Sequence, residues 1–263
     1  MSRAIRLVLT CLTIAAVSAA CGPASSSSSE EDLEGRFVIE YKSAESDETA
    51  AEEDFLRDRE ILEDFAADMN DFVAIPEDVN VVAEDCDESN AYYDPEAHSI
   101  TICYELAADE RTNFSEAGDS GEELDAEVYQ SMVATLYHEA GHALIGELEL
   151  AVTGREEDVA DQMAAYILTI DEESKEYLLT TADSYALSSE NKTLDESAFA
   201  DVHSLDEQRS ANFLCYVYGS DEDNFAYLVD DEILDADRAE TCGYEFEQLV
   251  DAWDTLLAPY VRA

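Results

Sequence analysis

Apolar and polar residues alternate in steps of two at residues 37–42, and residues 79–83 form a short apolar run. A period of two is typical of strands, in which successive side chains point to opposite faces. Asp94 and Pro95 lie between two further segments, at residues 91–93 and 99–104, which indicates a hairpin. The pattern predicts one small antiparallel sheet with strands at residues 37–42, 79–83, 91–93 and 99–104.

Apolar residues recur every three to four positions elsewhere, which is the period of an amphipathic helix. From Phe55 to Met69 this period predicts a helix before the break at Pro76. The pattern predicts an α+β fold in which the sheet packs on a long helix and a mainly helical C-terminal part follows. The later helices are expected at about residues 123–149 and 156–169 and through most of residues 175–263.

Residues 1–20 have the pattern of a signal peptide. Arg3 and Arg6 precede an uncharged apolar run that is too short for a stable transmembrane anchor. Small residues lead directly to Cys21, and a Ser-rich stretch follows it, which resembles a bacterial lipoprotein signal. The resemblance implies that Cys21 becomes a lipidated N-terminus.

After the signal peptide, the sequence predicts a flexible tether at residues 21–35 and one domain at residues 36–263. Lipidation at Cys21 predicts a cell-envelope lipoprotein, periplasmic or attached to the outer membrane. Ordinary cleavage after Ala20 is the alternative and predicts a secreted protein. Both predict export.

Export places the remaining cysteines in an oxidising compartment, where disulfides are expected. Four of them permit three pairings, and the local one is favoured because each of its pairs brackets a turn-containing segment. A four-thiolate metal site is the alternative, although no C-x-x-C spacing is present. The favoured pairs are Cys86 with Cys103 and Cys215 with Cys242.

Acidic residues dominate the charge, with 65 Asp and Glu against 13 Lys and Arg and a formal net charge of −52. Such a surface repels phosphates, so a nucleic-acid partner is excluded. Hydrophobic residues make up 46% of the chain, which argues against wholesale disorder. The acidic excess suggests work in salty surroundings, with a generic acidic surface as the alternative. A calcium-binding surface protein is a further alternative, but no D-x-D-x-D-G loop is present.

The long predicted helix contains the motif H-E-x-x-H, from His138 to His142. Its spacing puts both imidazoles on one helix face, where they can bind one zinc ion. Catalytic zinc usually has three protein ligands, and Glu157 on the next helix is the candidate for the third. Asp161, one turn later, can accept the other ring N–H of a His ligand. In so acidic a chain, a solvated helix face is the alternative for both carboxylates.

Zinc at this site would polarise a water molecule, and Glu139 would take the proton from it as the general base. His203 is the candidate donor to the oxyanion because it lies beside Asp201 and Arg209 in a motif-like stretch. A surface or core histidine is the alternative for His203.

The segment from His138 to Tyr166 resembles the gluzincins, zinc peptidases of the thermolysin type, whose second motif is E-x-x-x-D on the following helix. More of the chain, about residues 36–260, resembles the bacterial "putative metallopeptidase" domain of unknown function. The resemblance implies a zincin-like fold and no established substrate. The matching stretches are Cys86, Asn90–Pro95, Cys103–Glu105, the HEAGH helix, Asp201–Arg209 and Leu214–Gly219.

Asn90-Ala91 is similar to the Asn-Ala of the thermolysin edge strand, which implies that these residues bind the substrate backbone. The interval from His142 to Glu157 is shorter than in thermolysin, so the substrate pocket does not transfer. The sequence thus predicts an exported zinc metallopeptidase that acts on peptide or protein substrates and reaches the membrane through its lipid anchor. The alternative is an exported lipoprotein binding module that retains a structural zinc site without turnover.

Overall fold

The computed structural model describes residues 33–190, 196 and 198–262. The expected signal peptide, Cys21 and most of the tether therefore lie outside the described residues. Among the helices that are described, none is long and apolar enough to cross a membrane.

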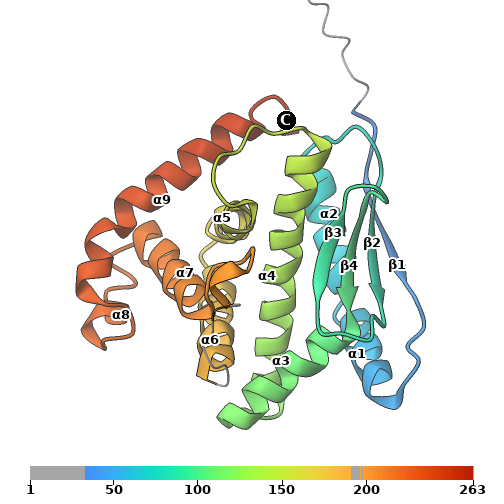
Figure 1. Ribbon diagram of the computed structural model, residues 1–263, viewed down its shortest axis with the longest axis horizontal. Coiled ribbons are helices and arrows are strands. Elements are labelled where there is room, and N and C mark those ends of the chain that lie inside the picture. The colour runs from blue at the N-terminus through green and yellow to red at the C-terminus, as the bar shows by residue number, and fades with distance from the viewer. Residues whose placement is uncertain (1–32, 191–195, 197, 263) are drawn as a thin grey trace, which may run out of the picture. The chain divides into compact units, whose positions relative to one another are not determined.

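A mixed four-stranded sheet with the order β1-β2-β4-β3 forms the right-hand part of Figure 1. Three of its strands are parallel, and only β3 runs antiparallel, paired with β4 at the edge. The α+β class is confirmed, but the predicted antiparallel sheet is wrong. The strands are β1 (Phe37–Tyr41), β2 (Val79–Glu84), β3 (Ala91–Asp94) and β4 (Ser99–Cys103).

The connection between β1 and β2 explains the parallel pairing, because it consists of two helices, α1 (Asp47–Asp58) and α2 (Ile61–Phe72). A crossover of this length returns the chain to the same end of the sheet, whereas antiparallel neighbours need only a tight turn. The sequence pattern predicts one helix here. The structure divides it at Glu60, whose backbone is left-handed with φ of 53°.

Helix α3 (Tyr104–Ala117) follows β4 without a loop and was not predicted. Its buried residues are few, and the buried Glu110 interrupts the apolar face that a periodicity argument requires. The predicted strand 99–104 includes Tyr104, which is the first residue of this helix. The strand therefore ends one residue earlier than expected.

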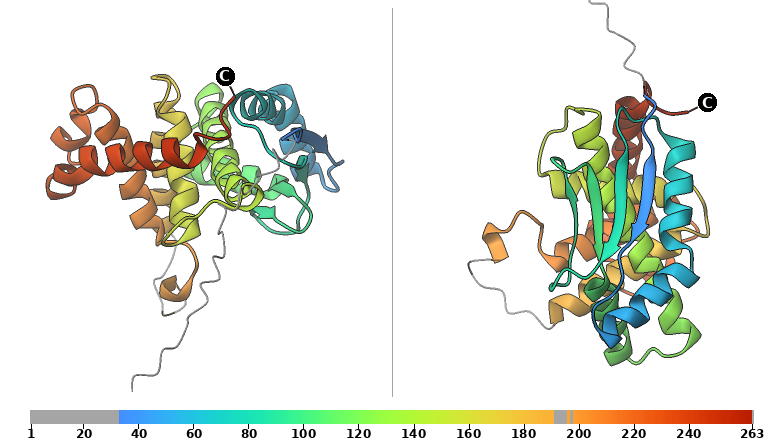
Figure 2. Two further views of the ribbon diagram at one scale, coloured as in Figure 1. Left: turned by 90° about the horizontal axis from the view of Figure 1, so that it is seen from above. Right: turned by 90° about the vertical axis from the view of Figure 1, so that its right-hand side faces the viewer.

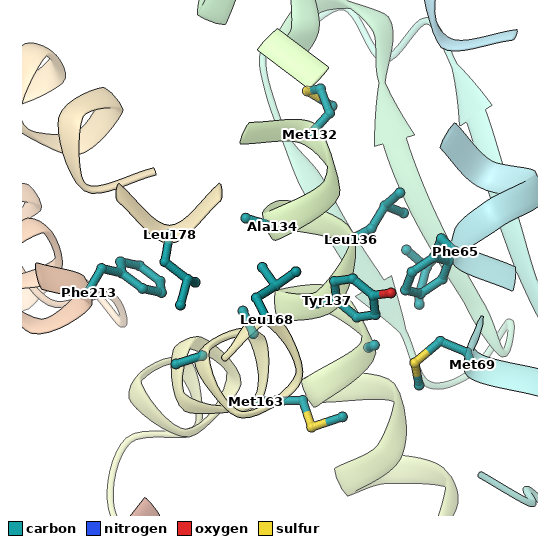
Figure 3. Close-up of a cluster of buried hydrophobic side chains, with 14 of the residues drawn as sticks. Phe65, Met69, Met132, Ala134, Leu136, Tyr137, Met163, Leu168, Leu178 and Phe213 are labelled. Carbon is teal, nitrogen blue, oxygen red and sulfur yellow. The ribbon is translucent and has the colours of Figure 1, made fainter. Parts of the chain in front are cut away.

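Helix α4 (Glu122–Glu147) is the long helix predicted from the sequence, and it contains the H-E-x-x-H motif. It lies between the sheet and the C-terminal helices (Figure 1). On one side Tyr137 packs edge-on against Phe65 of α2, with ring centroids 5.4 Å apart, as Figure 3 shows. Leu168, Leu178 and other apolar residues lie on its opposite side in the same figure. Core packing on both sides holds the motif in place.

The same face of the sheet supports both α2 and α4, which lie next to each other in the view from above in Figure 2. Phe37 of β1 contacts Phe65 of α2, with centroids 5.9 Å apart. At the other edge, a side chain added at Gly146 would meet the Tyr93 ring at 3.1 Å. The Tyr93 hydroxyl donates to Glu147 Oε1 at 2.6 Å, so β3 is attached to the end of α4.

The C-terminal part is helical, as expected, and packs on the side of α4 away from the sheet (Figure 1). The predicted second helix is confirmed as α5, which begins at the expected Glu156. The elements are α5 (Glu156–Leu168), α6 (Lys175–Glu190), the 3-10 turn η1 (Ala198–Ala200), α7 (Asp206–Ser220), α8 (Tyr227–Asp230) and α9 (Ala236–Leu257).

Two disulfides confirm the local pairing. Cys86–Cys103 joins the loop before β3 to the end of β4, and Cys215–Cys242 joins α7 to α9, with Cα atoms 5.5 and 5.1 Å apart. All four thiols are used, which excludes the four-thiolate metal site. Crosslinks of this kind typically contribute about 2–4 kcal/mol to stability.

Candidate metal centre

His138 and His142 lie on one face of α4, and Glu157 reaches them from the first turn of α5. Glu157 Oε2 lies 3.4 Å from His138 Nε2 and 3.2 Å from His142 Nε2. Ligand atoms of the three residues all fall within 4.8 Å of one another, so one metal ion can contact all of them. Two imidazoles and a carboxylate are a donor set that suits zinc and leaves a coordination position open.

Gly141, in the middle of the motif, allows α5 to approach α4 this closely. A Cβ atom at this position would lie 2.8 Å from the Ala160 Cα, closer than real Cβ contacts come. Because Ala160 lies in α5 between Glu157 and Asp161, a larger residue at position 141 would push both carboxylates away.

Each ring nitrogen that faces away from the centre has a carboxylate partner. His138 Nδ1 lies 2.8 Å from Asp161 Oδ1, and His142 Nδ1 lies 2.9 Å from Glu156 Oε1. A carboxylate partner favours the N–H on Nδ1 and turns the Nε2 lone pair towards the metal position.

Asp161 is held in turn by Arg209, which is buried and reaches it from α7. Arg209 Nε donates to Asp161 Oδ2 at 2.8 Å, and Nη2 donates to Oδ1. The guanidinium lies 4.1 Å from the centre of the Tyr185 ring on α6. Contacts with three helices therefore fix the orientation of the His138 ring.

The charges of the cluster are strongly coupled. Burial opposes protonation of His138, but hydrogen bonds to Asp161 and Glu157 outweigh it and raise the pKa of His138 to about 9. Burial also opposes ionisation of Glu157, yet hydrogen bonds from His138, His142 and His203 hold its pKa well below the ordinary value. The charge of Arg209 brings the pKa of Asp161 down to about 2 against the effect of burial. Protons and a metal cation would compete for this negative pocket.

Glu139 lies beside the cluster and is only 5% exposed. Burial is the largest influence on its carboxyl and raises its pKa above the usual value, while the two motif histidines act in the opposite direction. A carboxylate with raised proton affinity suits a general base.

His203 reaches the centre from the segment before α7. Its Nε2 lies 3.0 Å from Glu157 Oε2, and its Nδ1 lies 3.0 Å from Asp201 Oδ1. Arg155 donates to the His203 carbonyl at 3.1 Å, and the Ser204 hydroxyl donates to Asp158 at 2.7 Å. These contacts attach the segment to the start of α5. The structure brings His203 to the cluster, although it is 61 positions from His142 in the sequence.

Two cavities, of about 900 and 590 Å³, border the cluster. His138, Glu139 and His203 line both of them, as do Asn90 and Ala91 at the start of β3. An open cleft therefore runs past Glu139, with an edge strand along it. An extended peptide can pair with such an edge through its backbone.

The contacts of Glu156 with His142 and of Arg209 with Asp161 are not predicted from the sequence. Glu156 directly precedes Glu157, and that adjacency is the only signal for it in the sequence. Arg209 lies 48 positions from Asp161, and no local pattern links the two.

A family model described as "Putative metallopeptidase" matches residues 41–257. No curated protein and no solved structure gives a significant match to the chain.

Proposed function

The chain belongs to this metallopeptidase family, and on that premise we propose that it is a zinc-dependent peptidase with Glu139 as its general base. The observation that carries the proposal is the convergence of ligand atoms from His138, His142 and Glu157 within 4.8 Å, beside a buried Glu139. An arrangement of the gluzincin type, with a glutamate as the third ligand, accounts for this geometry.

His138, His142 and Glu157 would hold the zinc, and Asp161 and Glu156 would orient the two rings. A bound zinc ion would supply Lewis acidity, polarising a water molecule and the substrate carbonyl. Glu139 takes the proton of the attacking water and delivers it to the leaving nitrogen.

His203 would donate from Nε2 to the developing oxyanion in place of its present partner, Glu157 Oε2, while Asp201 holds its other nitrogen. The hydrogen bond to Glu157 is the largest influence on His203 and raises its pKa, which favours the protonated ring that donation requires. Asn90 and Ala91 would bind the substrate backbone along the β3 edge.

We also propose that the protein is exported and works on peptides or proteins at the cell envelope. The support is the signal-like residues 1–20, the lipoprotein-like Cys21 and the two disulfides. In this organisation residues 21–35 connect a lipid anchor to the domain at residues 36–263. Intact mass of the protein from native membranes should show an acylated Cys21, and an unmodified or absent Cys21 would contradict the anchor.

The decisive experiment separates metal binding from catalysis. Glu139→Gln should retain one zinc per chain and lose peptide hydrolysis, because Glu139 is a base and not a ligand. Alanine at His138, His142 or Glu157 should instead lose the metal. Metal content measured by mass spectrometry and digestion of a broad peptide library give the two readouts.

Two further variants test the roles proposed for the residues around the zinc ligands. Asp161→Ala should weaken zinc binding about 10- to 100-fold, as loss of a ring-orienting partner does. His203→Ala should keep the zinc and slow turnover about 100-fold or more. A wild-type protein that binds zinc but cleaves nothing in the library would contradict the peptidase and favour the binding-module alternative.

A further inference from the structure

The larger cavity extends away from the metal centre along α4, between α3 and α6. Its lining on α4 runs from Ser131 to Glu139, and the eight steps between these two residues correspond to about 12 Å of helix. A pocket of this depth beside the catalytic carboxylate suits a long side chain of a bound peptide.

Glu110 of α3 lies at the far end of this pocket from Glu139 and is 8% exposed. The Ser131 hydroxyl donates to its Oε2 at 3.0 Å, and the Ser184 hydroxyl donates to its Oε1 at 2.9 Å. Each carboxylate oxygen can accept a further hydrogen bond. Among the described residues, no lysine or arginine forms an ion pair with Glu110.

The rest of the lining also favours a cation. Asp109 and Glu207 add negative charge at exposed positions. Two cationic side chains of the same lining are already paired, Arg209 with both oxygens of Asp161 and His203 with Glu157 and Asp201. Hydroxyl and amide groups supply most of the remaining polar contacts, from Asn113, Thr135, Thr181, Ser188 and Ser189.

We propose that this pocket binds a lysine or arginine side chain next to the scissile bond of the substrate, with the Glu110 carboxylate as its ion-pair partner. The inference rests on the proposed function, since Glu139 defines where the scissile bond lies. A buried carboxylate without a cation is costly, and burial accordingly raises the pKa of Glu110. A long basic side chain supplies the missing charge and carries it away from the peptide backbone towards Glu110.

The experiment compares two peptide libraries of the same random sequence that contain no other basic residue, one with lysine and the other with norleucine in its place. The zinc-loaded wild-type protein digests both, and the zinc-loaded Glu139→Gln chain, immobilised, captures peptides from both without turnover. We expect cleavage and capture of the lysine library to exceed those of the norleucine library about 10- to 100-fold, from the usual strength of a hydrogen bond to a charged group. An arginine and citrulline pair should show the same preference.

Glu110→Gln keeps the shape of the side chain and removes its charge, so it should abolish the preference while retaining cleavage of norleucine peptides. Asp109→Asn is the matched control, because the same charge is lost from an exposed position, and it should change the preference only a few-fold. The wild-type comparison needs no variant, so it decides the matter even if Glu110→Gln does not fold.

The outcomes distinguish this inference from the proposed function. Cleavage of both libraries at equal rates would overturn the basic pocket and leave the peptidase intact. Selective capture without any cleavage would overturn the peptidase and support the pocket. Equal capture and no cleavage would overturn both.

Discussion

Asp161 joins the candidate metal centre to the helical core, since it contacts His138 through one oxygen and Arg209 through both. A buried carboxylate shared by an imidazole and a guanidinium is stable only when both partners are present. Tyr185 covers the guanidinium and extends the contact to α6. The orientation of one histidine ring thus depends on residues from three other parts of the chain.

Glu127, in contrast to Asp161, has a carboxylate oxygen without a partner. Among the described residues, its Oε2 is the one buried side-chain nitrogen or oxygen atom that forms no hydrogen bond. Burial, and then the charges of Asp119, Glu123 and Asp183, raise its pKa to about 7. The folded protein therefore binds this proton more tightly than the unfolded chain does. Below pH 4.5 Glu127 is protonated in both states and does not reduce the stability of the fold. As the pH rises towards 7, the buried carboxyl must lose its proton, and the folded state becomes less stable.

Glu127→Gln should consequently raise the melting temperature at pH 8 and change it little at pH 5, because the amide resembles the protonated acid. Thermal unfolding at both pH values measures the effect. Glu247→Gln, at an exposed position on α9, removes the same charge and serves as the control. Equal shifts for the two variants at pH 8 would mean that net charge, and not burial, is responsible.

Among the helices and strands, the close approach of α4 and α5 creates the candidate metal centre. The two helices bring His138 and Glu157 together only because position 141 has no side chain. On the other side, Tyr93 and His98 both contact Glu147 Oε1, at 2.6 and 2.7 Å, and attach the hairpin of β3 and β4 to the end of α4. The edge strand and the motif are thus parts of one packed unit.

Gly141→Ala should weaken zinc binding and lower the melting temperature, because the added methyl group meets the Ala160 backbone at 2.8 Å. Overpacking of this kind costs about 1–3 kcal/mol. Zinc titration and thermal unfolding provide the measurements.

Gly243→Ala in α9 is the matched control for that variant. The added methyl group would meet only the end of the flexible Glu222 side chain, which can move. Since alanine favours a helix over glycine by about 1 kcal/mol, this control should be neutral or stabilising. Unchanged zinc affinity in Gly141→Ala would contradict the role assigned to the helix approach.

At the scale of the whole molecule, the net charge of −52 opposes the compact state through repulsion between carboxylates. Only a minority of these groups can pair, since there are 13 Lys and Arg in the entire chain. The two disulfides act against this repulsion, because they limit how far an unfolded chain can expand.

Added NaCl should therefore stabilise the protein, since the screening length falls to about 3 Å at 1 M salt. We expect the melting temperature to rise steadily from low salt to molar NaCl, and equally in KCl. A melting temperature that does not change over this range would show that the surface charge is not adapted to salt.

Features that depend on neighbours along the chain are predictable from the sequence. Helical spacing placed His138 and His142 on one face of α4, and the turn at Asp94 and Pro95 predicted the hairpin. The disulfide pairing was also accessible, because each pair closes a short loop, with separations of 17 and 27 residues. Local geometry permits few alternatives for such features.

The contacts between distant segments of the chain are visible only in the folded structure. The spacing of apolar residues contains no information about strand order. It therefore does not predict the crossover that makes β1 and β2 parallel. In the sequence, nothing distinguishes Arg209 and Glu110 from the other charged residues. In the folded chain, α7 brings Arg209 to Asp161, and α3 brings Glu110 to Ser131 and Ser184. The physical reason is that the energy and the pKa of a buried charged group depend on the groups that replace water around it. Those groups come from distant parts of the chain.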